Sequence, residues 1–111
     1  MTKFERVKQL LNDAVGDRSP SHGGKGKFWN LPLDQLKALK VLGQKVIVTE
    51  GTDRGANSAL IKALKGEPPF DDDGFGRMPL DGPYLADADI AFIQQWIDDG
   101  CPEDEFTPVA R

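Results

Sequence analysis

The side chains with the clearest potential for chemistry are one histidine and one methionine in loop-like sequence. His22, the only histidine of the 111 residues, follows Pro20 after one residue, and Met78 stands between Arg77 and Pro79. An imidazole nitrogen and a thioether sulfur can together serve as the axial ligands of haem iron. These axial bonds need no covalent link between the chain and the haem. His22 and Met78 are therefore the candidate cofactor-binding residues.

Two further segments of the chain have distinctive sequence patterns that bear on this pair. Residues 77–79 read Arg-Met-Pro, and residues 85–102 have a helix-like pattern that ends in W-I-D-D-G-C-P. Together with His22, they resemble the class I cytochrome c-like domain, in the branch with an R-M-P loop and a W-I-D-x-G-x-P tail. That family attaches haem through a C-x-x-C-H motif, with the histidine as proximal ligand and the loop methionine as distal ligand. Here the two cysteine positions are Arg18 and Ser21, so the resemblance implies a scaffold without covalent haem attachment.

Hydrophobic spacing and capping residues predict the elements that would position these side chains. A first helix over about 3–15 begins with the T-x-x-E capping box of Thr2 and Glu5, in which each side chain accepts the other residue's free N–H. A second helix is expected from Pro32 towards Gly43, because leucines recur there at helical spacing, namely Leu33, Leu36, Leu39 and Leu42. The other expected elements are an extended segment over 45–49, a helix capped by Asn57 or Ser58 and ended by Gly66, and a helix over about 87–99 capped by Asp87.

This order predicts an all-α fold: a cytochrome c-like bundle of about four helices with long loops. A single domain would span 1–102, followed by a frayed tail over 103–111. The first and last helices are expected to cross in contact, because neither amphipathic helix can bury its apolar stripe alone. The expected contacts join Phe4, Val7 or Leu11 to Ile93, Trp96 or Ile97.

Composition narrows the classes of partner and location. A formal net charge of −4 without a basic stripe argues against nucleic acid. No segment approaches the roughly 20 apolar residues of a membrane-spanning helix. The start of the chain lacks the apolar region of a signal peptide. A lone Cys101 allows no internal disulfide and fits a reducing compartment, so we expect a cytoplasmic protein.

Other motifs with chemical potential do not match their templates. The acidic run before Gly74 suggests calcium, but setting Gly74 at the sixth position of an EF-hand loop places Pro69 at the first and Leu80 at the twelfth, where oxygen ligands are needed. A looser calcium site stays an alternative to a solvated acidic loop. The glycine-rich run 23–27 lacks the spacing of a phosphate-binding loop. Cys101 lies just past a helix C-terminus, which disfavours a reactive thiolate.

Aromatic residues are frequent in the expected loops, namely Phe28, Trp29, Phe70, Phe75 and Tyr84. In a haem protein they would pack on the macrocycle; without haem they must fill its space, because an apolar void is strongly destabilising. We therefore expect Phe28 or Trp29, with Phe75 and Met78, to collapse into the space that haem would otherwise fill. The alternative is an exposed aromatic patch that binds a partner.

The main hypothesis is a haem-free cytochrome c-like accessory module that binds no cofactor and no metal, is not an enzyme, and binds a protein partner, for example a redox enzyme. The second hypothesis is a noncovalent haem electron carrier with His22 and Met78 as axial ligands. A third is a calcium-stabilised binding domain.

Overall fold

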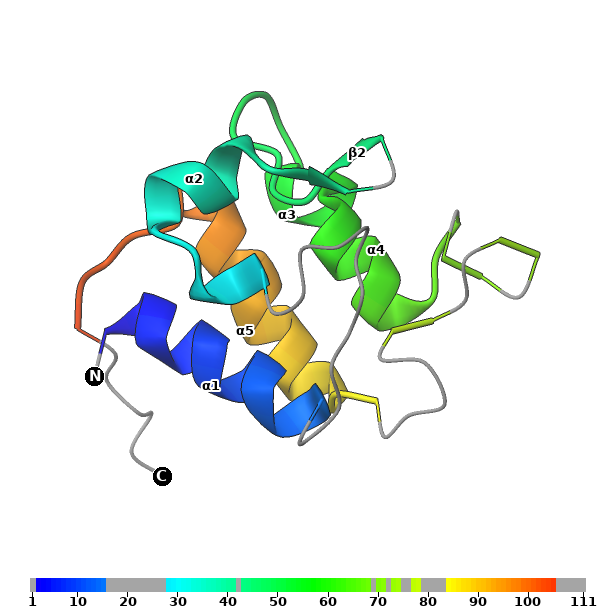
Figure 1. Cartoon of the computed structure of the whole chain (residues 1–111), viewed down its shortest axis with the longest axis horizontal. Helices are drawn as coiled ribbons and strands as arrows, with labels where there is room; N and C mark the ends of the chain where they lie inside the picture. The colour runs from blue at the N-terminus through cyan, green and yellow to red at the C-terminus, as the bar shows by residue number, and fades with distance from the viewer. Residues whose placement is uncertain are drawn as a thin grey trace.

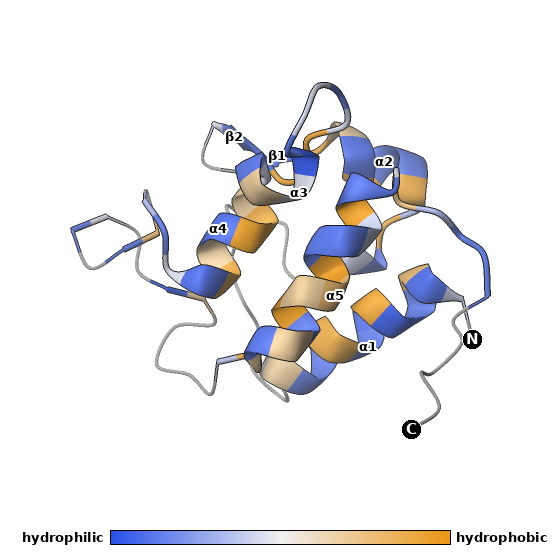
Figure 2. Ribbon diagram, turned by 180° about the vertical axis from the view of Figure 1, so that it is seen from behind, coloured by the Kyte–Doolittle hydropathy of each residue, from blue (hydrophilic) through white to orange (hydrophobic). Residues whose placement is uncertain are grey.

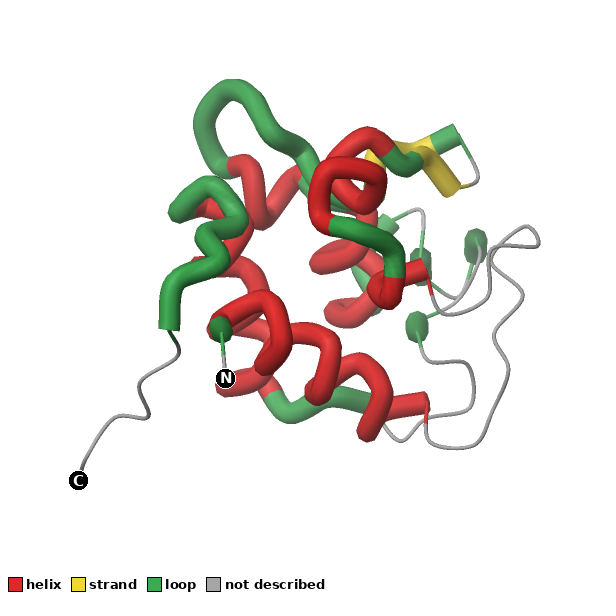
Figure 3. Tube along the Cα trace, turned by 60° about the vertical axis from the view of Figure 1, so that its left-hand side comes forward, coloured by secondary structure: helices red, strands yellow, loops and turns green. Residues whose placement is uncertain are grey.

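The computed structural model describes residues 2–15, 28–41, 43–68, 70–71, 73–74, 77–78 and 84–105, and this part of the chain is mostly helical. The elements are, in chain order, α1 (Lys3–Val15), the 3-10 helix η2 (Phe28–Asn30), α2 (Leu33–Ala38), β1 (Lys40–Val41), β2 (Gln44–Lys45), α3 (Arg54–Asn57), α4 (Ala59–Lys65) and α5 (Asp87–Asp98). Figure 1 shows α1 lying across α5, with α4 beside them and the β1–β2 hairpin at one edge. Figure 3 shows how small the strand segment is relative to the helices.

Helix α1 begins as its capping box predicts. The Thr2 backbone N–H donates to Glu5 Oε1 at 2.7 Å, and the Glu5 N–H donates to Thr2 Oγ1 at 3.1 Å. The two bonds satisfy N–H groups that the first turn of a helix leaves without partners. The bond from the Thr2 N–H, together with a side-chain hydrogen bond from Thr2, also lowers the pKa of the Glu5 carboxyl. Blue and orange positions alternate along α1 and α5 in Figure 2, as in amphipathic helices.

The predicted crossing of the first and last helices is confirmed. The rings of Phe4 in α1 and Trp96 in α5 stack with centroids 5.6 Å apart and planes 4° from parallel. Both rings are buried, with exposed fractions of 5% and 2%. Such a pair adds attraction beyond the burial of its area, so this contact fixes where the two longest helices meet.

Helix α2 is shorter than its leucine spacing predicted. It ends at Ala38 rather than near Gly43, because Leu39 is already extended with ψ 138°. The chain then forms an antiparallel hairpin in which Lys40 pairs with Lys45, and Gly43 takes φ 75° at the turn. The strand therefore lies at 44–45 rather than over 45–49. Reversing the chain here lets the two residues that follow, Val46 and Ile47, enter the core.

The middle of the chain contains two short helices where one was expected. Ser58 precedes α4, as predicted, but its side chain does not cap that helix. Its hydroxyl accepts from the Val48 N–H and donates to the Arg54 carbonyl, both at 2.8 Å. Ser58 is fully buried, so these bonds join the β2–α3 segment to α3 and α4. Helix α4 ends where predicted, with Gly66 at φ 75°.

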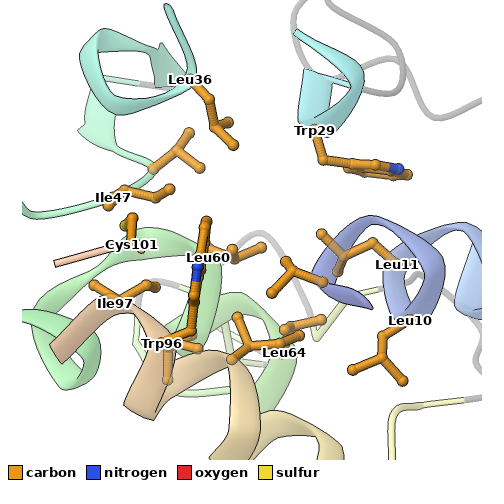
Figure 4. Close-up of a cluster of buried hydrophobic side chains, with 14 of the residues drawn as sticks. Leu10, Leu11, Trp29, Leu36, Ile47, Leu60, Leu64, Trp96, Ile97 and Cys101 are labelled. Atoms are coloured by element: carbon orange, nitrogen blue, oxygen red, sulfur yellow. The ribbon is translucent and has the colours of Figure 1, made fainter. Parts of the chain in front are cut away.

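The core is formed mainly by side chains of α1, α4 and α5, together with Leu36 of α2 and Ile47. Figure 4 shows Trp96 at the centre of this cluster, with Leu60, Ile97 and Cys101 close by. The largest hydrophobic side chains that are fully buried are Val7, Leu36, Ile47, Ile61, Ile90, Ile93, Trp96 and Ile97. All are aliphatic or aromatic residues of one buried cluster, so the described core is held together by the hydrophobic effect.

Residues after α5 return to the start of α1. Thr2 and Glu105 form an antiparallel bridge, and the Lys3 N–H donates to the Asp104 carbonyl at 2.9 Å. The Lys3 ammonium also lies 3.0 Å from the Asp104 carboxylate. Asp104 and Glu105, which belong to the tail expected at 103–111, thus pair with the N-terminal segment. Residues 106–111 lie outside the described residues.

Candidate functional site

Only one residue of the predicted ligand pair, Met78, lies among the described residues. His22 lies outside the described residues, as do Arg18 and Ser21. Met78 is described, and its backbone N–H donates to the Ala63 carbonyl of α4 at 2.9 Å. Its partly buried side chain packs against a small cluster of Ala59, Ala63 and Phe70. Met78 is therefore attached to α4 by both its backbone and its side chain.

Arg77 joins the same helix one residue earlier. Its Nε donates to the Leu64 carbonyl at 2.8 Å, near the helix C-terminus where carbonyls lack partners within the helix and the dipole favours cations. The guanidinium carbon lies 4.3 Å from the centroid of the Tyr84 ring. A Cβ at Gly66 would lie 3.1 Å from Arg77 Cβ, so only a glycine leaves comfortable room there. Arg77 and Met78 of the predicted loop thus both pack against α4.

The aromatic residues of the expected loops lie in two separate hydrophobic clusters. Phe28 and Trp29 belong to the main core, where their rings make an edge contact with centroids 5.1 Å apart and Trp29 Nε1 donates to Asn12 Oδ1 at 2.9 Å. Phe70 instead belongs to the cluster that contains Met78. Among the described residues, the expected grouping of Phe28 or Trp29 with Met78 is not seen, because η2 packs on α1 whereas residues 77–78 pack on α4. Phe75 lies outside the described residues.

The W-I-D-D-G-C-P tail holds α5 in place through its polar atoms. Trp96 Nε1 donates to the Pro102 carbonyl at 2.9 Å, which closes the chain back on the end of α5. The Asp98 carboxylate accepts from the Gly55 N–H, and Arg54 Nη2 donates to the Asp98 carbonyl, both at 2.7 Å. These bonds join α5 to α3. Trp96, Asp98 and Pro102 of the tail pattern thus each take part in a hydrogen bond that stabilises the fold.

Cys101 is a buried thiol in a left-handed backbone conformation, with φ 56°. Burial raises the pKa of this thiol from 9.0 to about 11, and the nearby charges of Lys37 and Arg54 offset only part of that rise. A thiol in this state stays protonated at neutral pH and lacks the thiolate that nucleophilic chemistry needs. The structure gives Cys101 a role in packing.

The acidic run is described at Asp71 and Asp73, whereas Asp72 lies outside the described residues. Across the described ranges, no three histidine, cysteine, aspartate or glutamate side chains are grouped so that they could hold a metal ion. In the same part of the chain, no helix has the length and apolar character needed to cross a bilayer.

A pocket that the sequence did not predict lies between the end of α4 and the first turns of α5. Its lining residues come from three segments and are Lys65, Arg77, Asp87, Ile90, Ala91 and Gln94. The helix-forming pattern of α4 and α5 could be predicted, but the position of Arg77 beside α4 depends on the fold of the loop between them. No local motif marks these residues as neighbours.

No protein-family model matches the chain, and neither the curated proteins nor the solved structures contain a match. The likeness to cytochrome c-like domains therefore depends on the residues quoted above.

Proposed function

We propose that this chain is a haem-free module with a cytochrome c-like fold that is not an enzyme and that binds a protein partner, such as a redox enzyme. The observation that carries this proposal is the packing of the aromatic residues. Phe28, Trp29 and Phe70 are each less than a tenth exposed and pack among the protein's own side chains. In a haem protein of this size, such rings would be needed against the macrocycle.

The sequence supports the same proposal. Arg18 and Ser21 occupy the positions at which the resembled family has its two haem-attaching cysteines, and neither can form a thioether. Retaining haem would then depend on two axial bonds and on burial of the porphyrin. Met78 is half-buried, and its side chain already packs against Phe70.

Tyr84 supports a role in binding a partner. With 47% of its surface exposed, it is the exposed large hydrophobic residue among those the structure describes. The Arg77 guanidinium packs on its ring, which holds both side chains in place. Tyrosine and arginine are enriched among the residues that dominate binding energy at protein interfaces. A preordered pair of this kind loses little side-chain entropy when a partner binds.

Haem titration tests the main proposal. Haem added to the purified protein should give only the spectrum of free or weakly associated haem. A stoichiometric low-spin spectrum that is lost in both His22→Ala and Met78→Ala, and kept in the control Cys101→Ala, would contradict the proposal. That result would establish the electron-carrier alternative.

Two further measurements test the remaining parts. Calcium should leave the melting temperature unchanged; a calcium-dependent rise that Asp71→Asn and Asp73→Asn abolish would favour the calcium-stabilised alternative. For the partner, a photo-crosslinking residue in place of Tyr84 should capture a specific protein in the native cell. A crosslinker at exposed Asn30 on η2 serves as the control. Identical products from both positions would argue against a binding surface at Tyr84.

A further inference from the structure

The pocket between α4 and α5 is a half-open depression with room for a small molecule and a lining that is mainly charged or polar. Its volume is about 370 Å³, at the small end of the range of roughly 300–1,000 Å³ that ligand pockets span. Its walls carry two cationic side chains, Lys65 and Arg77, and one anionic side chain, Asp87. Ile90 and Ala91 add an apolar surface, and Gln94 adds an amide.

The Arg77 side chain is fixed in an orientation that suits the binding of an anion. Its Nε bond to the Leu64 carbonyl and its contact with the Tyr84 ring restrict the guanidinium to one orientation. The guanidinium keeps further N–H donors at its terminal nitrogens, which suit the two oxygens of a carboxylate. Because the side chain is only partly exposed, solvent screens its charge less than on an open surface. Arg77 is thus a preorganised donor at the pocket wall.

Lys65 and Asp87 have no ion-pair partner among the described residues. Lys65 is the last residue of α4 and is exposed, and Asp87 is the first residue of α5 and is also exposed. An ammonium group offers only donors, whereas a carboxylate offers only acceptors. A ligand that satisfies both must therefore carry an anionic group and a hydrogen-bond donor.

We propose that this pocket binds a small amino dicarboxylate. One carboxylate would bind the Arg77 guanidinium and the other the Lys65 ammonium, while the ligand's ammonium group would bind the Asp87 carboxylate. Its aliphatic carbons would lie against Ala91 and Ile90. A phosphate offers no strong donor to Asp87, and a divalent cation would be repelled by the two basic side chains. This inference does not depend on the absence of haem, but it shares Arg77 with the partner-binding surface proposed at Tyr84.

Titration of L-glutamate into the full chain, followed by calorimetry or NMR, tests the site. We expect saturable binding that Lys65→Ala weakens by about two- to fivefold, the range that an ion pair with an exposed lysine contributes. Lys45→Ala, which removes an exposed lysine of β2 outside the pocket, is the matched control and should bind as the parent does. Circular dichroism verifies that each variant is folded.

Glutarate, which has the two carboxylates but no ammonium group, tests the role of Asp87. It should bind more weakly than L-glutamate to the parent, and Asp87→Asn should remove that difference. The proposal is overturned if L-glutamate shows no saturable binding at millimolar concentrations, or if Lys65→Ala and Lys45→Ala bind it equally. Equal affinity of the parent for glutarate and L-glutamate would overturn it as well.

Discussion

The carboxylate of Asp98 in α5 accepts a hydrogen bond of 2.7 Å from the backbone N–H of Gly55 in α3. Gly55 lies in the first turn of α3, where N–H groups have no partner within the helix. The N-cap residue Asp53 gives no side-chain bond, so a side chain distant in the sequence acts as the cap. Gly55 also permits the close approach, because a Cβ there would lie 2.6 Å from Gln94 Cγ and from the Gln94 carbonyl oxygen.

Removing the Asp98 carboxylate should destabilise the fold. Asp98→Ala leaves the buried Gly55 N–H without its acceptor, at a cost of about 1–3 kcal/mol in the free energy of unfolding. Asp99→Ala is the matched control, since Asp99 is exposed and accepts only from the neighbouring Gln95 side chain. Its effect should stay within about 0.5 kcal/mol. Urea unfolding measures both variants, and equal losses would show that the α3–α5 bond contributes little.

Adding one methyl group at Gly55 should separate α3 from α5. Gly55→Ala requires Gln94 and the α5 backbone to move, and overpacking of this kind costs about 1–3 kcal/mol. The neighbouring substitution Asn57→Ala, at an exposed position of the same helix, should be nearly neutral. Thermal melting compares the two variants. A Gly55→Ala variant as stable as its parent would mean that the two helices do not pack this closely.

Truncating the central indole should cause the largest loss. Trp96→Ala removes a ring that is 2% exposed and stacked on Phe4, and such a change costs about 3–5 kcal/mol. This is a large part of a typical stability of about 5–15 kcal/mol. Trp96→Phe keeps a ring against Phe4 but loses the bond from Nε1 to Pro102, so its loss should be smaller. A melting temperature of Trp96→Ala within a degree of the parent would show that the indole lies at the surface.

The sequence predicted the elements whose signals are local. The capping box at Thr2 and Glu5, the end of α4 at Gly66 and the crossing of the two amphipathic helices all follow from spacing within one segment or from the need to bury an apolar stripe. The end of α2 was missed because its leucine spacing continues past Ala38, whereas burial of Val46 and Ile47 favours a hairpin.

The pocket and the packing of α3 on α5 depend on tertiary contacts that no local sequence pattern encodes. Helix α3 has only four residues and is stabilised by Asp98, which lies far along the chain. Arg77 reaches the pocket because its Nε bonds the Leu64 carbonyl, which spacing alone does not reveal. Ser58 shows the same limit: a capping residue was expected, but tertiary contacts bind its hydroxyl to Val48 and Arg54.

The capping box should make the stability of the fold depend on pH in the acid range. Its hydrogen bonds to Thr2 lower the pKa of Glu5 from 4.5 in the folded protein. The ionised carboxylate therefore stabilises the fold above its ordinary pKa, and this contribution is lost as the pH falls through the lowered value. Glu5→Gln should unfold with a weaker dependence on pH below about 4.5 than the parent. Asp13→Asn, an exposed position near the other end of α1, is the control and should behave as the parent. Parallel pH profiles for parent and Glu5→Gln would contradict the prediction.

The buried thiol should have the opposite effect at alkaline pH. Burial raises the pKa of Cys101 from 9.0 to about 11, so the folded state keeps its proton where the unfolded state has lost it. The stabilisation is complete below about pH 9 and is lost as the pH rises towards 11. The stability of the parent relative to Cys101→Ala should therefore fall across this interval, as measured by urea unfolding at several pH values. A thiol reagent at pH 8 should also modify Cys101 slowly in the folded protein and quickly in urea. Equal rates in the two conditions, or a constant difference in stability from pH 9 to 11, would show that the thiol is open to solvent.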